Sequence, residues 1–212
     1  MPISILLIDD HKLLIETWRD LLSRDEDFII GAIAHTPEAA RLELKNWVPD
    51  VIVCDINLGS GKESGFKLVP GLRAMRPKVA ILAVSAFAAP AIVKRMLDIG
   101  ANGYVSKHSP FNELVTGIKT VYKKEPYLCS YTLGQIAEMM PGDPLDEAKI
   151  AILTEKELLI MQQVRDGFSS VEIGKNLGIS SKTVDAHRYH ILRKLDLPNT
   201  AAVIGFMKRH GL

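Results

Sequence analysis

The N-terminal part of the sequence alternates short apolar runs with stretches in which apolar residues recur at helical spacing. The apolar runs are Ile3–Ile8, Phe28–Ala34, Val51–Cys54, Val79–Val84 and Gly103–Ser106. The helical stretches that follow them start near Leu13 and then cover Pro37–Asn46, Phe66–Met75, Pro90–Ile99 and Phe111–Lys123. Short apolar runs bounded by turn residues are typical of buried strands, and their alternation with helices indicates a parallel sheet covered on both faces. Residues 1–125 therefore predict a five-stranded, parallel, doubly wound α/β domain.

The remainder of the sequence predicts a linker followed by a domain built from helices. Residues 126–150 contain a short helical pattern at Thr132–Met140 and a cluster of turn residues at Pro141–Pro144, which indicates a linker. Residues 151–212 carry no strand pattern. We expect an all-α domain of four short helices there, the last at about Thr200–Lys208.

Cap signals mark the starts of the first three of these helices. Thr154 with Glu157, and Ser169 with Glu172, have the spacing of a capping box, and Ser180 is expected to cap a third helix. The second and third helices are then separated by only a short turn. This spacing is typical of a helix-turn-helix.

The composition of the chain indicates the kind of partner and the cellular compartment to expect. The chain carries 26 basic and 25 acidic residues, but the segment from Gly167 to Leu212 holds seven Lys or Arg against three acids, a balance suited to a polyanionic partner. The two cysteines suggest neither a disulfide framework nor a four-ligand zinc site, and the sequence shows no signal peptide or membrane span. We expect a protein of the reducing cytoplasm with no membrane partner.

Polar residues follow four of the expected strands. Asp9 and Asp10 come after the first strand, Asp55 after the third, Ser85 after the fourth and Lys107 after the fifth. The carboxyl ends of parallel strands meet at one edge of the sheet, where open α/β sheets bind their ligands. Clustered carboxylates suit Mg²⁺, and a hydroxyl and an ammonium beside them suit the oxygens of a phosphoryl group.

The stretch Ser180–Leu195 is the expected second helix of the helix-turn-helix, after a helix at Val171–Leu177. On a helical wheel its inward face carries Val184, Ile191 and Leu195, with His187 at the border. The opposite face carries Lys182, Ala186, Tyr189 and Arg193, flanked by Asp185 and His190. A helix with such a face is suited to enter the major groove of DNA.

Together these residues resemble the two-component response regulators of the NarL/FixJ type, in which a receiver domain is joined to a LuxR-type helix-turn-helix domain. The resemblance covers nearly the whole chain and implies a flavodoxin-like receiver sheet. It implies that Asp55 is the phosphoacceptor for the phosphohistidine of a sensor histidine kinase. It also implies that Asp10, Asp55 and the backbone carbonyl of Asn57 hold Mg²⁺, with Asp9 acting through a water molecule.

The same resemblance assigns roles to the other strand ends and to the helical domain. Ser85 and Lys107 would bind the phosphoryl oxygens, and Tyr104 matches the aromatic residue that turns inward when the protein is switched on. In the helical domain the residues that match the LuxR-type pattern are Glu157, Gly167, Glu172, Ile173, Thr183, Val184, His187, Lys194 and Leu195.

The stretch Ser180–Leu195, called the recognition helix below, is expected to contact both the phosphates and the bases of DNA. Phosphate contacts are expected from Lys182, Arg188 and Arg193, base contacts from Asp185, Ala186 and Tyr189, and Thr183 is also placed in the DNA-binding set. The family often has a basic residue where this chain has Asp185. An acid repels phosphate but accepts a hydrogen bond from cytosine, so we expect exchange of Asp185 for Lys to change the preferred DNA site.

Two enzyme readings fit the sequence poorly. The segment Gly61–Ser64 suggests a nucleotide-binding phosphate loop, but Ile56 and Glu63 stand where that motif needs Gly and Ser or Thr. An aspartyl-phosphate phosphatase with Asp9 as nucleophile would need an acid where His11 stands.

The loop Leu58–Gly65 is about two residues longer than is usual in the family, and its glycines suggest mobility beside the acceptor.

The sequence therefore predicts a phosphorylation-controlled transcription regulator rather than an enzyme, with only slow self-catalysed phosphoryl transfer and dephosphorylation. We expect it to bind paired half-sites on double-stranded DNA as a homodimer. The alternative is a constitutive DNA-binding regulator that does not need phosphorylation.

Overall fold

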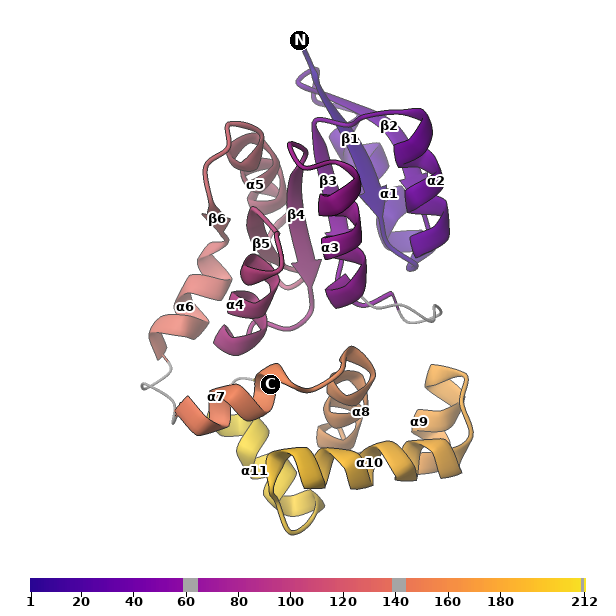
Figure 1. The fold of residues 1–212 in the computed structure, drawn as a ribbon, viewed down its shortest axis with the longest axis vertical. Coiled ribbons are helices and arrows are strands. Elements are labelled where there is room, and N and C mark those ends of the chain that lie inside the picture. The colour runs from indigo at the N-terminus through magenta and orange to yellow at the C-terminus, as the bar shows by residue number, and fades with distance from the viewer. Residues whose placement is uncertain (59–64, 139–143, 211) are drawn as a thin grey trace. The chain divides into compact units, whose positions relative to one another are not determined.

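A computed structural model describes residues 1–58, 65–138, 144–210 and 212 (Figure 1). It divides into two compact units. The first comprises Met1–Ala86 and Val93–Leu133, and the second comprises Gly134–Leu212, with which the short segment Phe87–Ile92 is grouped. Among the described residues, no helix has both the length and the apolar composition needed to cross a membrane.

The first unit is built on a parallel sheet. Its strands are β1 (Ile3–Ile8), β2 (Phe28–Ala34), β3 (Val51–Asp55), β4 (Ala80–Ser85), β5 (Gly103–Ser106) and β6 (Tyr127–Leu128). Their order in the sheet is β2-β1-β3-β4-β5-β6, and every neighbouring pair is parallel. Because β1 lies between β2 and β3, the chain changes direction across the sheet at β1, which is where such folds place their binding sites.

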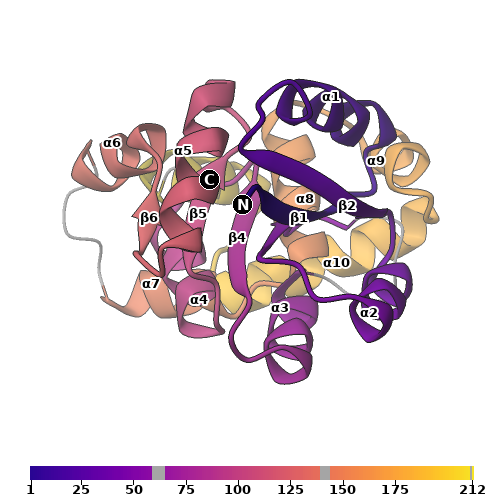
Figure 2. The same cartoon turned by 90° about the horizontal axis from the view of Figure 1, so that it is seen from above.

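Helices cover both faces of this sheet. They are α1 (Lys12–Leu22), α2 (Pro37–Asn46), α3 (Gly65–Met75), α4 (Pro90–Asp98) and α5 (Phe111–Tyr122). Figure 2 shows α1 and α5 on one face and α2, α3 and α4 on the other. The core between the sheet and the α1–α5 face contains Ile15 and Leu22 of α1 and Ile118 and Val121 of α5, all fully buried. The predicted doubly wound α/β class is confirmed.

The element boundaries agree closely with the sequence prediction. Strands β1, β2 and β5 have the expected bounds, and so has α2, where the side chain of Thr36 accepts a hydrogen bond from the backbone N–H of Ala39. The long loop after Asp55 cannot be compared, because residues 59–64 lie outside the described part of the chain.

The segment that was predicted as a linker contains more structure than expected. The two-residue strand β6 adds a sixth strand to the sheet, and the predicted short helix is α6 (Ser130–Glu138). A two-residue strand leaves no period to detect in the sequence, so it was missed. A further helix that was not predicted, α7 (Pro144–Ala151), precedes the helical domain.

The helical domain contains α8 (Glu155–Arg165), α9 (Ser170–Leu177), α10 (Ser181–Leu195) and α11 (Thr200–His210). Both predicted capping boxes are present, at Thr154 with Glu157 and at Ser169 with Glu172. The side chain of Ser180 caps α10, and Gly178 ends α9 in the left-handed conformation, with φ of 63°. The α9-turn-α10 pair therefore has the predicted helix-turn-helix form.

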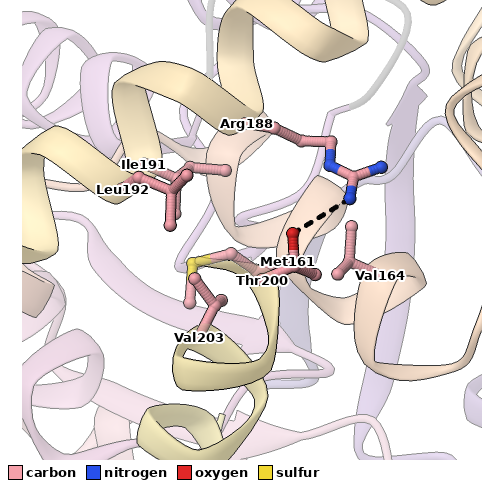
Figure 3. A pocket seen from close by; sticks show the side chains of 7 residues that line it. All are labelled: Met161, Val164, Arg188, Ile191, Leu192, Thr200 and Val203. Atoms are coloured by element: carbon pink, nitrogen blue, oxygen red, sulfur yellow. Dashed lines mark hydrogen bonds between the residues drawn. The ribbon is translucent and has the colours of Figure 1, made fainter. Parts of the chain in front are cut away.

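The second helix of this pair packs as the wheel predicted. Val184, Ile191 and Leu195 are buried, and His187 is half-buried, which lowers its pKa. Beside them, α8, α10 and α11 enclose a hollow lined mainly by apolar side chains (Figure 3). Its volume is about 10 Å³, room for about one water molecule. The hollow is therefore part of the packing rather than a ligand site.

Candidate phosphoacceptor site and nucleic-acid interface

Three carboxylates converge at the carboxyl edge of the sheet. Strands β1 and β3 are neighbours, with Ile8 paired to Cys54, so Asp9 and Asp55 follow adjacent positions at that edge. Asp9 is fully buried and Asp55 is 1% exposed. One carboxylate oxygen from each of Asp9, Asp10 and Asp55 lies within 4.8 Å of the others. The predicted convergence of these acids is thus present.

Lys107 joins two of the acids. Its Nζ lies 2.7 Å from Oδ2 of Asp55 and 2.9 Å from Oδ2 of Asp9. The end of β5 holds the lysine in place, because its backbone N–H donates to the carbonyl of Ser85 at 2.7 Å. Burial by itself would lower the pKa of Lys107, but attraction to Asp55 and Asp9 outweighs burial and raises it. The lysine is therefore a permanent cation in an acidic pocket.

Asp55 is oriented by donors on both of its oxygens. Oδ2 accepts from Lys107, and Oδ1 accepts from the backbone N–H of Asn57 at 3.0 Å. Burial raises the pKa of Asp55 to about 6, and the nearby charge of Asp9 adds to this, while Lys107 opposes it. The carboxylate is thus ionised near neutral pH, but it is held in a setting that favours a further positive charge.

The donor atoms around Asp55 suit a hard divalent cation. Three carboxylates outnumber the single ammonium group of Lys107, and all three offer oxygen. The side-chain oxygen of Asn57 is also buried, and within the described residues it has no hydrogen-bond partner. An oxygen-only donor set with excess negative charge fits Mg²⁺ better than it fits a softer metal.

Ser85 and Tyr104 are linked beside the acids. Ser85 ends β4 and is fully buried, and Tyr104 on β5 is fully buried as well. A side-chain hydrogen bond joins the two, while burial raises the pKa of the Tyr104 hydroxyl, which is therefore neutral. Tyr104, the residue predicted to act as the switch aromatic, is therefore a buried neutral partner of Ser85.

The expected DNA-binding face of α10 is exposed. Lys182, Thr183, Asp185, Ala186, Tyr189 and Arg193 are all exposed, and Tyr189 retains 58% of its accessible surface. A positively charged face with an exposed aromatic ring can contact phosphates and bases together. The exposure of these six side chains is compatible with the predicted DNA contacts.

Arg188 differs from the other members of the predicted set because it is half-buried, with its guanidinium group bonded to two other helices of the helical domain. Its Nη1 donates to Oγ of Ser170 at 2.9 Å, and its Nη2 donates to Oγ1 of Thr200 at 3.1 Å (Figure 3 shows the second bond). Ser170 in turn donates to Oδ1 of Asp185 at 2.6 Å. Sequence reasoning missed Ser170 and Thr200, because no local pattern reveals a contact between three helices.

A buried ion pair holds α8 against α10. Oε2 of Glu157 lies 2.7 Å from Nζ of Lys194, and the Glu157 side chain is only 4% exposed. Burial opposes ionisation of Glu157, but the hydrogen bonds from Lys194 and Thr154 prevail and lower its pKa. Both residues were predicted from the family pattern without a stated contact.

The fold and the acidic edge are together those of a receiver domain joined to a helix-turn-helix domain. Residues 5–119 match the family described as response regulator receiver domain, and residues 151–207 match bacterial regulatory proteins of the luxR family. The chain therefore belongs to the response regulators that carry a DNA-binding domain of the LuxR type. The predicted family is confirmed.

Known proteins of similar sequence and structure agree with this placement. The oxygen regulatory protein NreC of Staphylococcus epidermidis is 29% identical over 209 residues, which cover 96% of this chain and 95% of the relative. A two-component response regulator of the LuxR family from Aurantimonas sp. has a TM-score of 0.60 at 28% identity, over 65% of this chain and 97% of its own. RcsB from Salmonella enterica serovar Typhimurium, bound to a promoter in the presence of a phosphomimetic, has a similar fold, with a TM-score of 0.65 at 22% identity over 98% of each chain.

Proposed function

We propose that Asp55 accepts a phosphoryl group from the phosphohistidine of a sensor histidine kinase, and that this event controls sequence-specific DNA binding by the helical domain. The observation that carries the proposal is the buried carboxylate of Asp55, held 2.7 Å from Nζ of Lys107 among two further acids. A structural acid needs no such arrangement. A nucleophile that must receive a dianionic group does need it.

The proposed reaction is a displacement at the phosphorus atom with Asp55 as the nucleophile. One of its carboxylate oxygens attacks the phosphorus atom, the phosphorus–nitrogen bond of the phosphohistidine breaks, and the imidazole leaves with the bonding electrons. The product is an acyl phosphate on Asp55. Lys107 moves its ammonium contact from the carboxylate to a phosphoryl oxygen, which offsets the charge that is brought into the pocket.

Asp10, Asp55 and the backbone carbonyl of Asn57 would hold Mg²⁺, with Asp9 acting through a water molecule. The bound ion would supply positive charge to the phosphoryl oxygens during transfer. Asp9 already serves a second purpose, because its Oδ2 accepts from Lys107 at 2.9 Å and so keeps the ammonium at the edge of the sheet. We expect a single label on each chain instead of sustained turnover.

Ser85 and Tyr104 would couple phosphorylation of Asp55 to a change in the conformation of the chain. A phosphoryl oxygen that binds the Ser85 hydroxyl competes for the group that now bonds Tyr104. The chain would have one state in which the Ser85 hydroxyl bonds Tyr104 and another in which it bonds the phosphoryl group. Phosphorylation would shift the populations of these two states. The activated chain would bind paired DNA half-sites as a homodimer, as RcsB dimers are described on DNA.

The compartment that we propose for the protein is the cytoplasm. Its two cysteines, Cys54 and Cys129, are free and buried, which fits a reducing environment.

The alternative is a constitutive DNA-binding regulator that does not need phosphorylation. Its helical domain would bind DNA equally well with and without a phosphoryl donor, and Asp55 would not control DNA affinity.

The deciding experiment measures DNA affinity with and without acetyl phosphate and Mg²⁺, for wild type and Asp55→Ala, after a preferred site has been selected from random duplexes. The phosphorylation proposal expects about tenfold tighter binding by labelled wild type, an allosteric coupling of about 1.4 kcal/mol, and no response from the variant. Equal affinity in all four samples would establish the constitutive alternative instead.

Binding of Mg²⁺ is expected to stabilise the first unit. At a free Mg²⁺ concentration about 100 times Kd, the gain is about 2.7 kcal/mol, because the ion binds only the folded chain. Thermal unfolding at increasing Mg²⁺ concentration measures it. Since the pKa of Asp55 is about 6, protons compete with the ion, and its affinity should fall as the pH drops through that value.

The matched pair for this measurement is Asp10→Asn and Asp98→Asn. Asp10 lies in the acidic cluster, whereas Asp98 is an exposed residue of α4 that pairs with Lys94 at 2.7 Å. Asp10→Asn should lose most of the stabilisation by Mg²⁺, and Asp98→Asn should keep all of it. An equal response in both variants would contradict the assigned site.

A further inference from the structure

A chain of hydrogen bonds runs from α11 through α10 to α9 and back to the exposed face of α10. Arg188 on α10 donates to Thr200, the first residue of α11, at 3.1 Å, and to Ser170, the first residue of α9, at 2.9 Å. Ser170 then donates to Oδ1 of Asp185 at 2.6 Å. The chain thus ends on a carboxylate of the predicted DNA-binding face.

The direction of these bonds is fixed by the chemistry of the groups. A guanidinium group only donates, and an ionised carboxylate only accepts. The Ser170 hydroxyl must therefore accept from Arg188, and its single hydrogen must go to Asp185. Reversal at either end would remove a bond, so the hydroxyl works as a one-way connector from the cation to the anion.

This arrangement leaves Asp185 half engaged. Oδ1 is held by Ser170, whereas Oδ2 makes no hydrogen bond within the part of the chain that the structure describes, and the residue is exposed. An aspartate on a helix surface normally samples several rotamers, and ordering it on binding costs free energy. Here one oxygen is anchored, so the direction of the other is set before any partner arrives.

Charge gives the arrangement a second consequence. An acid on a surface that meets DNA phosphates is repelled unless a cation lies close by. Arg188 supplies that cation through Ser170, and it is half-buried, with two of its N–H groups engaged inside the domain. It is therefore poorly placed to contact phosphate itself, in contrast to the exposed Arg193 on the same helix.

We propose that Ser170 and Arg188 are positioning residues that hold Asp185 as a hydrogen-bond acceptor for a base amino group, which in the major groove is the N4 amino group of cytosine or, less favourably, the N6 amino group of adenine. The inference rests on the DNA-binding part of the proposed function. It assigns Ser170 a part in sequence recognition, and it assigns Arg188 a part other than the phosphate contact that the sequence suggested.

The test uses the full-length chain with Ser170→Ala, Asp185→Ala and Arg188→Ala. Sites are selected from a randomised duplex library with wild type, and affinities for the best site and its single-base variants follow by fluorescence anisotropy. Asp185→Ala should lose discrimination by about tenfold or more at one base pair, the scale of one hydrogen bond to a charged acceptor. Ser170→Ala and Arg188→Ala should lose discrimination at that same base pair.

Two further variants separate positioning from other effects. Ser170→Thr keeps the hydroxyl and should retain the wild-type preference. Arg193→Ala removes the same charge from the same helix as Arg188→Ala, but it should weaken binding to all sequences alike and reduce the salt dependence by about one phosphate contact. Adding Ser170→Ala to Asp185→Ala should cause no further loss of discrimination, because both act through one acceptor. Far-ultraviolet circular dichroism of each variant checks that α9 and α10 are folded.

Three outcomes would overturn this inference. Ser170→Ala could keep the wild-type preference while folded, Ser170→Thr could lose the preference as fully as Ser170→Ala, or Arg188→Ala could weaken all sequences alike as Arg193→Ala does. Each leaves the proposed function standing. A wild-type chain that selects no sequence, with or without a phosphoryl donor, would overturn the proposed function and this inference with it.

Discussion

Asp55→Asn is expected to abolish incorporation of a phosphoryl group from acetyl phosphate in the presence of Mg²⁺. The amide keeps the shape of the side chain and can still accept a hydrogen bond from Asn57, but its oxygen is too weak a nucleophile to displace the leaving group from phosphorus. Intact-mass spectrometry of the treated protein measures the result. We expect a stoichiometric label on wild type and none on the variant.

Asp98→Asn is the matched control, because it removes one acid from an exposed position in α4 and should label like wild type. Lys107→Ala is informative beside it. Loss of the ammonium group leaves Asp9 and Asp55 buried without the cation that now lies 2.9 and 2.7 Å from them, so labelling should slow without changing its location. A full label on Asp55→Asn would move the acceptor to another residue, and peptide mapping would identify it.

The acidic edge could be predicted from sequence because each of its members lies at the end of a strand or within two residues of it. An apolar run such as Val51–Cys54 identifies a buried strand, and parallel strands bring their carboxyl ends to one edge whatever lies between them. The position of Asp55 beside Asp9 therefore follows from local pattern and topology. Ser85 and Lys107 were placed beside the acids by the same argument, because they come at the ends of the fourth and fifth strands. The role of Tyr104 came from the family resemblance alone, because period and spacing do not reveal what a side chain bonds.

Features that depend on side chains from separate elements could not be predicted. The acid of Glu113 on α5 accepts from the Tyr127 hydroxyl and from the backbone N–H of Ser130, which attaches β6 and the start of α6 to the sheet domain. No pattern in residues 126–150 announces this attachment. The bonds of Arg188 to Ser170 and Thr200 were missed for the same reason, since they connect residues that are 18 and 12 positions apart.

The helical domain offers the second large expected effect, at Glu157. Its Oε2 accepts three hydrogen bonds, from the backbone N–H of Thr154 at 2.7 Å, from Oγ1 of Thr154 at 2.9 Å and from Nζ of Lys194 at 2.7 Å. One carboxylate oxygen thus closes the capping box of α8 and joins α8 to α10. Glu157→Ala is expected to destabilise the domain by about 3 kcal/mol, at the lower end for breaking a buried ion pair, because Lys194 is 30% exposed and can be rehydrated.

Unfolding followed by two probes measures this loss. Far-ultraviolet circular dichroism follows the helices of both units, whereas the two tryptophans, Trp18 and Trp47, belong to the first unit alone. The variant should lower the midpoint of the helical transition, by about 4–8 °C for each kcal/mol in a domain of this size, and leave the tryptophan transition in place. The acid contributes this stability when it is ionised. Its pKa in the folded chain lies below the usual 4.5, so the difference between wild type and variant should shrink as the pH falls through the folded pKa.

Glu172→Ala provides the matched comparison, because Glu172 closes the equivalent capping box on α9. It accepts from the backbone N–H and Oγ of Ser169 at 2.8 and 2.6 Å, as Glu157 does from Thr154, but it is exposed, and no ion pair to a lysine of another helix is found for it within the described residues. If the cap alone explained the effect at Glu157, the two variants would lose similar stability. A much larger loss in Glu157→Ala, largely reproduced by Lys194→Met, would show that the Glu157–Lys194 ion pair holds α10 against α8. Both variants should have this effect because removal of either partner breaks the same contact. Equal losses in Glu157→Ala and Glu172→Ala would refute that role for the ion pair.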